Sequence, residues 1–264
     1  DTFYQKGITD EFMEPIVIND STIKTNDVVI NLNFRPDRGL QLSQAFDLPT
    51  FNNFQKDNIT NLYFVGMVEY SKSFPSKVIF PKQYVNLPLG KVIDSVGLRQ
   101  LRIAETEKFP HVTYFFNGGA SVVYANEDQI AIPSPAVATY DLKPEMSALD
   151  VLSVLTKRMS TNAYDFILVN FANADMVGHS GVLEAGIKAV QTVDYCVHEL
   201  TNAFLAQGGA VIITADHGNV EEMINLQNNT ADTEHSLNPV PCIIAGTNIT
   251  NRFLPYGSLK DVAP

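Results

Sequence analysis

The chain has 264 residues, of which 45% are hydrophobic, and this is enough for one large or two modest domains. Its formal net charge of −11 argues against nucleic acid and anionic membrane surfaces as main partners, although local cations and a metal could still hold a small anion. No apolar run approaches the roughly 18 residues of a membrane span, and no signal peptide opens the sequence. We therefore expect a cytoplasmic protein in which Cys196 and Cys242 are buried, reduced thiols.

The first 75 residues contain two strand patterns with a helical pattern between them. Apolar runs predict strands over residues 28–34 and 62–69, and apolar spacing predicts a helix over residues 38–46. Prolines among lysines then break the pattern between residues 71 and 91, which is the strongest linker signal in the sequence. The predicted organisation is a domain over residues 1–75, a linker over 76–91 and a second domain over 92–264.

From residue 92 onwards, predicted helices and strands alternate. We expect helices over residues 92–96, 147–159 and 182–205, and strands over residues 99–104, 166–171, 210–213 and 241–245. Residues 107–116 are ambiguous, but Gly118-Gly119 would stop a short helix there. Ser147 should cap its helix, with Asp150 as the capping partner. The alternation indicates an α/β domain with a parallel sheet.

An acid and an imidazole follow the predicted strand 210–213. Asp216 offers an anionic oxygen and His217 a neutral nitrogen, a pair that suits a divalent cation such as zinc or manganese. Gly218 would allow the backbone to turn sharply beside the ion. Taken alone, such a tripeptide is more often a capping aspartate and a surface histidine at a strand end, roughly three times in four.

Two further loops supply residues of the same kinds. After the strand 166–171, Asp175 and His179 lie four residues apart, so one helical turn would place both on one side. The candidate ligands are therefore Asp175, His179, Asp216, His217 and His235. They are too many for one structural ion and one carboxylate short of two catalytic sites, and two-metal centres about 4 Å apart serve phosphoryl transfer. Ser180 is expected to be a helix cap, His198 a surface or packing residue, and His111 has no assigned role.

Three cations are candidates for anion binding. Arg35 and Arg38 lie three residues apart just beyond a predicted strand, which suits bidentate capture of a phosphate or carboxylate. The alternative is two solvated arginines that pair with Asp37. Lys108 stands between carboxylates in the sequence, and a surface ion pair is its alternative.

Four motifs stand in order along the chain: Phe34-Arg35-Pro36-Asp37-Arg38, Ala104-Glu105-Thr106-Glu107-Lys108-Phe109, Asn170-Phe171-Ala172-Asn173-Ala174-Asp175-Met176-Val177-Gly178-His179 and Thr214-Ala215-Asp216-His217-Gly218-Asn219. Together they resemble the motifs of the cofactor-independent phosphoglycerate mutases, and the resemblance runs over essentially the whole chain. The resemblance implies an α/β, alkaline-phosphatase-like sandwich with a mostly parallel central sheet, preceded here by the end of an inserted transferase domain. It also implies two divalent ions, Mn²⁺ or Zn²⁺, a transiently phosphorylated serine and no bisphosphoglycerate cofactor.

The resemblance also implies roles for individual residues. Asp175, His179 and His235 would hold one ion, and Asp216 and His217 the other, together with an aspartate and a nucleophilic serine from a stretch that would precede Asp1. Arg35 and Arg38 would grip the substrate, and Lys108 would stabilise the charge of the phosphoryl group.

On this basis we expect the C-terminal portion of a glycolytic mutase, with an incomplete phosphatase domain and no activity alone. The full-length protein would be a monomer that interconverts 3- and 2-phosphoglycerate, without nucleic-acid or membrane partners. The alternatives are another metal-dependent phosphomutase or phosphatase of the same superfamily, or a non-catalytic metal-binding module.

Overall fold

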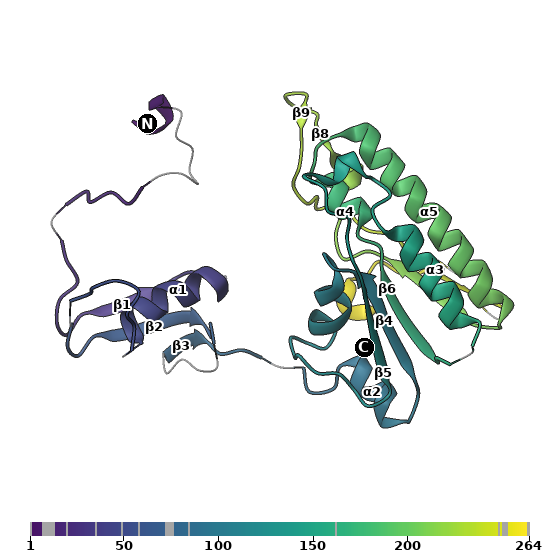
Figure 1. Ribbon diagram of the computed structural model, residues 1–264, viewed down its shortest axis with the longest axis horizontal. Helices are drawn as coiled ribbons and strands as arrows, with labels where there is room; N and C mark the ends of the chain where they lie inside the picture. Colours follow the sequence, from purple (N-terminus) through teal and green to yellow (C-terminus); the bar gives the residue numbers. More distant parts are fainter. Residues whose placement is uncertain are drawn as a thin grey trace. The chain divides into compact units, whose positions relative to one another are not determined.

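The computed structural model divides the chain into two compact units, Asp1–Gln83 and Tyr84–Pro264, which are described separately (Figure 1). The described residues are 2–6, 14–19, 21–34, 36–48, 50–57, 59–71, 77–83, 85–161, 163–247, 249 and 253–262. The division falls inside the expected linker. Within these ranges, the helices are all too short or too polar to cross a membrane.

The first unit is a three-stranded parallel sheet with one helix packed against it. Its strands are β1 (Val28–Asn31), β2 (Tyr63–Val68) and β3 (Lys77–Phe80), in the order β1-β2-β3, and α1 (Pro36–Asp47) contacts β2; a short 3₁₀ helix, η1, covers Tyr4–Lys6. The two predicted strands and the helix are confirmed. Residues 77–80 were expected in the linker, but they form β3, because the prolines at 75 and 81 flank this strand and leave its N–H groups free to pair.

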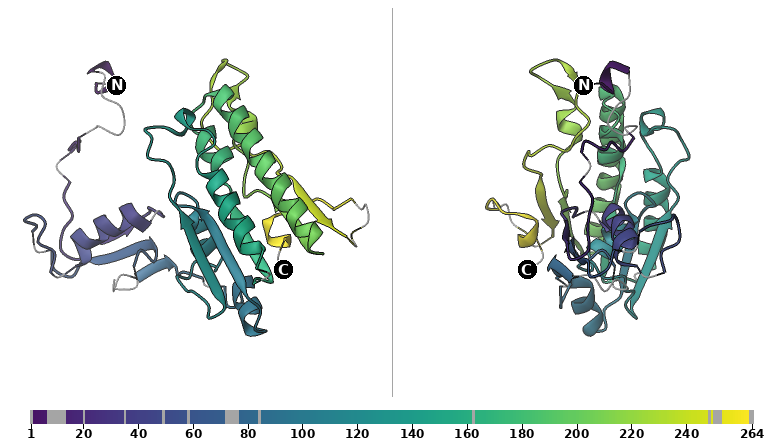
Figure 2. Two further views of the ribbon diagram at one scale, coloured as in Figure 1. Left: turned by 45° about the vertical axis from the view of Figure 1, so that its right-hand side comes forward. Right: turned by 90° about the vertical axis from the view of Figure 1, so that its left-hand side faces the viewer.

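The second unit is built on a parallel sheet in the order β5-β4-β6. These strands are β4 (Gln100–Glu105), β5 (Glu127–Ile132) and β6 (Phe166–Asn170). Helices α3 (Ala148–Met159) and α5 (Leu183–Ala206) run side by side along one face of this sheet (Figures 1 and 2). The core between them contains Leu101, Ile103, Val151, Leu155, Met159 and Leu200.

The opposite face of β4 is polar, since alternate residues of a strand point to opposite faces. Gln100 and Arg102 are fully buried there, against α2 (Leu89–Ser95) and the segment that follows the π-helix η3 (His111–Phe115). The ambiguous segment 107–116 thus contains a short helix, and the positive φ angles of Gly118 and Gly119 end it as predicted.

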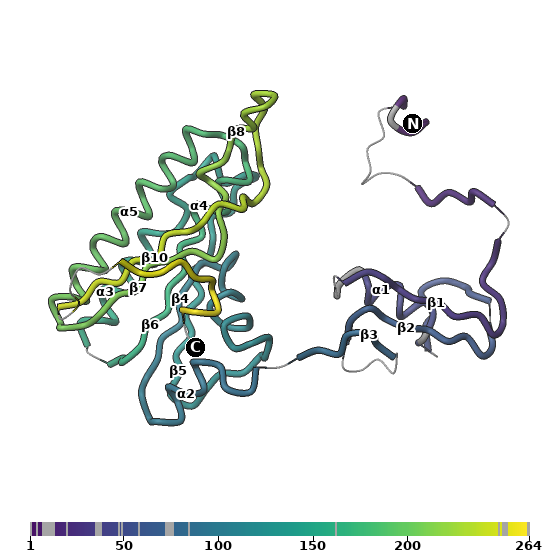
Figure 3. Tube along the Cα trace, turned by 180° about the vertical axis from the view of Figure 1, so that it is seen from behind, coloured from purple at the N-terminus to yellow at the C-terminus, as the bar shows by residue number. Residues whose placement is uncertain are grey.

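The predicted helices and strands are present, together with β5, which was not predicted, and the parallel α/β arrangement holds for β4, β5 and β6. It fails for β7 (Ala210–Thr214), which pairs antiparallel with β10 (Cys242–Gly246) (Figure 3). Cys242 is exposed on this two-stranded sheet, against expectation, whereas Cys196 is buried and burial raises the pKa of its thiol to about 11. The remaining elements are η4 (Tyr140–Leu142), α4 (Asn173–Gly178), η5 (Val220–Glu222), β8 (Ile224–Asn225), β9 (Thr230–Ala231) and η6 (Leu259–Asp261).

Helix α3 begins as predicted, but the predicted cap is wrong. Ser147 makes no side-chain cap hydrogen bond, and its hydroxyl instead donates to the carbonyl of Pro133 at 2.8 Å. Its backbone N–H donates to Glu105 Oε1 at 3.0 Å. Ser147 therefore ties the start of α3 to the ends of β4 and β5, which fixes the helix against the sheet.

Candidate metal centre

Helix α4 follows β6 and carries Asp175, and His179 is its C-cap residue. Asn173 is buried, and its side-chain amide donates to the carbonyl of Pro144 at 2.8 Å, which anchors the helix. One turn of this helix then brings His179 Nε2 to 3.2 Å from Asp175 Oδ1, as the spacing of four predicts. The His179 Nδ1 atom lies 2.6 Å from the carbonyl oxygen of Thr233, which orients the ring.

Two more imidazoles reach the same carboxylate from different loops. His235 Nε2 lies 3.1 Å from Asp175 Oδ1 and 3.2 Å from His179 Nε2. The rings of His217 and His235 stack with centroids 3.7 Å apart, and His217 Nε2 lies 4.0 Å from Asp175 Oδ1. Asp175, His217 and His235 each offer one ligand atom within 4.8 Å of the others. Residues more than 40 positions apart in the chain thus meet at one point.

This donor set fits a divalent cation. Two imidazole nitrogens only 3.2 Å apart cannot both be acceptors for each other, so without an ion one ring has to donate. A cation would accept the lone pairs of both rings and of the carboxylate together. A mixture of imidazole nitrogen and carboxylate oxygen suits metals of intermediate softness, such as Mn²⁺ and Zn²⁺.

Asp216 lies at the edge of this group. Its Oδ2 atom is 3.7 Å from His217 Nε2, and its side chain is 44% exposed. His217 therefore contacts both predicted ligand groups, Asp216 on one side and the His235 ring on the other. The division of the five ligands between two ions stays a prediction.

Lys108 is part of the same site and makes no surface ion pair. Only 7% of the residue is exposed, and its ammonium donates to Asp175 Oδ2. Burial works to raise the pKa of Asp175, but the hydrogen bond and charge of Lys108, with help from Asn219 and His179, outweigh it and lower that pKa. Asp175 is consequently held as a carboxylate.

The structure adds Asn219 to the residues identified from sequence. It is 5% exposed, and its amide nitrogen lies 3.0 Å from Asp175 Oδ1 and 3.4 Å from His179 Nε2. A Cβ on Gly178 would come within 2.0 Å of Asn219 Oδ1, so glycine is needed there for this contact. The only signal in the sequence was the position of Asn219, two residues after His217.

The structure also shows where His111, Ser180 and His198 lie. His111 lies in η3, where burial and the charge of Lys108 lower the pKa of its imidazole despite Asp216 and Asp175 nearby. Ser180 is not the expected helix cap, since the N-cap of α5 is Val182, and the Ser180 hydroxyl instead donates to the carbonyl of Val177 at 2.6 Å. His198 is away from the cluster, with its Nε2 atom 2.9 Å from the Asn202 amide on the exposed side of α5.

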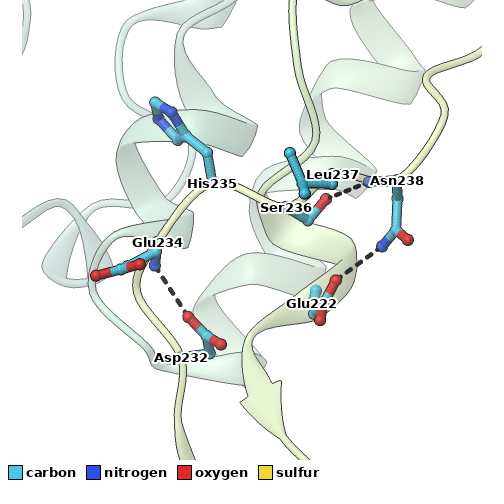
Figure 4. A pocket seen from close by; sticks show the side chains of 7 residues that line it. All are labelled: Glu222, Asp232, Glu234, His235, Ser236, Leu237 and Asn238. Atoms are coloured by element: carbon cyan, nitrogen blue, oxygen red, sulfur yellow. Dashed lines mark hydrogen bonds between the residues drawn. The ribbon is translucent and has the colours of Figure 1, made fainter.

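A polar cavity opens beside His235 on the segment between β9 and β10 (Figure 4). Its lining residues are Glu222, Asp232, Glu234, His235, Ser236, Leu237 and Asn238. Its lining therefore includes three carboxylates and one imidazole.

The side chains of the two candidate arginines of the first unit are not described. Arg35 lies outside the described residues, and Arg38 belongs to α1 without a described side chain. That Arg35 and Arg38 bind a substrate stays a prediction.

A parallel α/β unit that gathers carboxylate and imidazole ligands from three loops has the form of a metalloenzyme. The chain belongs to the metalloenzyme superfamily, whose family model matches residues 19–264. Within that superfamily it is 48% identical over 265 residues to the 2,3-bisphosphoglycerate-independent phosphoglycerate mutase of Symbiobacterium thermophilum. It is 47% identical over 270 residues to the enzyme of the same name from Clostridium acetobutylicum.

These alignments cover 99% and 100% of this chain but 51% and 53% of the relatives, so the chain spans about half the length of the curated relatives it matches. A solved structure of Leishmania mexicana phosphoglycerate mutase, obtained at low cobalt concentration, is similar at a TM-score of 0.67 and 31% identity. That match covers 88% of this chain and 45% of the other. The expected fold class and family resemblance are confirmed.

Proposed function

We propose that this chain carries the metal-binding part of a 2,3-bisphosphoglycerate-independent phosphoglycerate mutase. The observation that supports this most strongly is the convergence of Asp175, His179, His217 and His235 on one point, in a chain 47–48% identical to enzymes of that name. The proposed reaction moves a phosphoryl group between the 3- and 2-hydroxyls of glycerate through a phosphoserine. The proposed setting is cytoplasmic glycolysis and gluconeogenesis, with a monomeric enzyme and no bisphosphoglycerate cofactor.

The proposed ligand sets are those of the sequence analysis. Asp175, His179 and His235 would hold one ion, and Asp216 and His217 would contribute to the second, with manganese or zinc as the metal. When bound, such ions supply positive charge that stabilises the attacking and leaving oxygens in phosphoryl transfer.

Lys108 would bring a fixed positive charge to the phosphoryl group. Its ammonium is already desolvated and directed at the ligand carboxylate, so little reorganisation is needed when an anion arrives. Arg35 and Arg38 would add bidentate contacts to the carboxylate or phosphate of the substrate.

The serine that becomes phosphorylated would come from residues beyond these 264. The family resemblance assigns this role to no serine of these residues, and a phosphoserine route requires an alcohol nucleophile poised at the metal centre. We therefore expect the 264-residue chain alone to convert no 3-phosphoglycerate.

Calorimetric titration of the metal-stripped chain with Mn²⁺ and Zn²⁺ tests the metal centre. We expect one ion bound with usable affinity and a second bound weakly, because Asp216 and His217 alone leave the second site incomplete. Asp175→Asn should weaken binding strongly, since it removes the anionic ligand, and His198→Ala should leave it unchanged. Two equally tight sites, or equal losses in both variants, would contradict the proposed ligand assignment.

A further inference from the structure

The carboxylate of Glu221 joins two loops that each carry a candidate ligand. Glu221 lies in η5, and its Oε2 atom accepts the backbone N–H of Asn219 at 2.8 Å. Its Oε1 atom accepts the hydroxyl of Ser236 and the side-chain amide of Asn238, the latter at 3.2 Å. One side chain thus binds to the loop 216–219 with one oxygen and to the loop 234–238 with the other.

These contacts reinforce the one place where the two loops pair through their backbones. Gly218 and Ser236 form an isolated antiparallel bridge, in which the Ser236 N–H donates to the carbonyl of Gly218 at 3.0 Å. His217 directly precedes one residue of this bridge, and His235 directly precedes the other. The bridge therefore sets how the two imidazole rings stack.

Packing at this bridge explains the glycine of the Asp-His-Gly motif. A Cβ on Gly218 would lie 2.2 Å from both Glu221 Oε1 and Ser236 Oγ. Gly218 is not among the described glycines with positive φ, so the sharp turn expected from sequence is not what requires it. Glycine is needed because the carboxylate and the hydroxyl approach the backbone so closely.

We propose that Glu221 is a positioning residue that holds the loops 216–219 and 234–238 in register, so that His217 and His235 present their nitrogens to the same metal centre. This inference rests on the proposed metal centre. Glu221 would act on that centre only through the loops that carry His217 and His235. Glu221 is exposed, so each hydrogen bond alone is weak, but three donors converge on one carboxylate. Burial would raise the pKa of Glu221, yet these hydrogen bonds together lower it, which favours the ionised acceptor.

The neighbouring Glu222 provides a matched control. It accepts only the Asn238 amide, at 2.9 Å, among the contacts described between these loops. Glu221→Gln and Glu222→Gln remove the same charge from almost the same place, so a general electrostatic effect on a cation would be equal in both. Glutamine keeps one acceptor oxygen and gains a donor, so in Glu221→Gln either Asn219 or Ser236 loses its partner.

The experiment is calorimetric titration of the metal-stripped 264-residue chain with Mn²⁺. Outer hydrogen-bond partners of metal ligands typically contribute 10–100-fold in affinity, so we expect Glu221→Gln to weaken binding about tenfold. Glu222→Gln should stay within about twofold of the wild type. Ser236→Ala should also weaken binding, Ser236→Thr should restore it, and Ser236→Ala combined with Glu221→Gln should lose less than the product of the single effects.

A second measurement needs no metal. In the metal-free chain, the imidazole C–H resonances of His217 and His235 should shift in Glu221→Gln and stay in place in Glu222→Gln, with His198 as an internal reference. Equal loss of Mn²⁺ affinity in the two variants, or unmoved His217 and His235 resonances, would overturn the positioning role. A wild-type chain that binds no Mn²⁺ would overturn the metal centre instead, and shifted resonances would then still support the loop contact.

Discussion

Replacing Lys108 with methionine tests how the central carboxylate is held when no metal is bound. Methionine keeps the apolar part of the side chain but removes the ammonium that donates to Asp175 Oδ2. The lysine side chain is 8% exposed and that of Asp175 is 15% exposed, so the pair is largely out of water. The change therefore leaves a carboxylate in a poorly solvated place without its cation.

We expect a loss of about 3 kcal/mol in the free energy of unfolding. Breaking a buried ion pair by removing one partner typically costs about 3–5 kcal/mol. We expect the lower end because Asp175 Oδ1 keeps the Asn219 amide at 3.0 Å and His235 Nε2 at 3.1 Å. The longer and more exposed pair of Lys188 and Glu145, with side chains 63% and 36% exposed, gives the control, since breaking it with Lys188→Met should cost at most about 1 kcal/mol.

Urea unfolding of the metal-free chain, followed by far-UV circular dichroism, measures this loss, because α3 and α5 of the second unit give most of the helical signal. The lowered pKa of Asp175 means that its stabilising effect is present above about pH 4 and is lost as the pH falls through the folded-state value. In Lys108→Met, burial should instead raise that pKa, and protonation in acid relieves the penalty. The difference between wild type and variant should therefore be largest at pH 7 and shrink below about pH 5.

Adding Mn²⁺ should restore part of the lost stability, because the ion supplies the missing positive charge. Equal losses for Lys108→Met and Lys188→Met, or a difference that does not change with pH, would refute the reasoning about Asp175.

Two further substitutions test the packing at the candidate metal centre and on the polar face of β4. Gly178→Ala should weaken Mn²⁺ binding in the same titration, because the new Cβ displaces the Asn219 side chain from Asp175, whereas a helix substitution of this kind is otherwise stabilising. Arg102→Met should lower the free energy of unfolding by about 3–5 kcal/mol, since it leaves the buried Glu127 carboxylate without its cation 4.0 Å away. Adding Glu127→Gln should recover much of that loss, and a single variant as stable as wild type would contradict the pairing.

The hydrophobic patterns of the sequence predicted helices and strands reliably where one face of the element packs against the core. The long amphipathic pattern predicted α5 to within one residue at each end, and the apolar run predicted β6. They failed at β5, whose first three residues, Glu127 to Gln129, are polar. Glu127 and Gln129 lie on the polar face of the sheet, where Glu127 is close to Arg102, so this strand, which carries one member of a buried charged pair, lacks an apolar pattern at its start.

For the candidate site, residue chemistry and strand ends were enough to find the ligands but not what surrounds them. Asp175 and His179 meet through one helical turn, which a local rule predicts. Asn219 and Glu221 act across gaps of 44 and 15 residues, onto Asp175 and Ser236 respectively, and no local rule connects such positions. Their roles follow only from the fold that brings the loops together.

The two carboxylate oxygens of Asp175, at the centre of the site, have different partners. Oδ2 receives the ammonium of Lys108, whereas Oδ1 faces the imidazoles of His179 and His235 and the amide of Asn219. An ion bound through Oδ1 would therefore leave the contact between Oδ2 and Lys108 in place. Lysine and metal would then both contact one carboxylate. In the proposed reaction, a phosphoryl group bound beside them would face both positive charges.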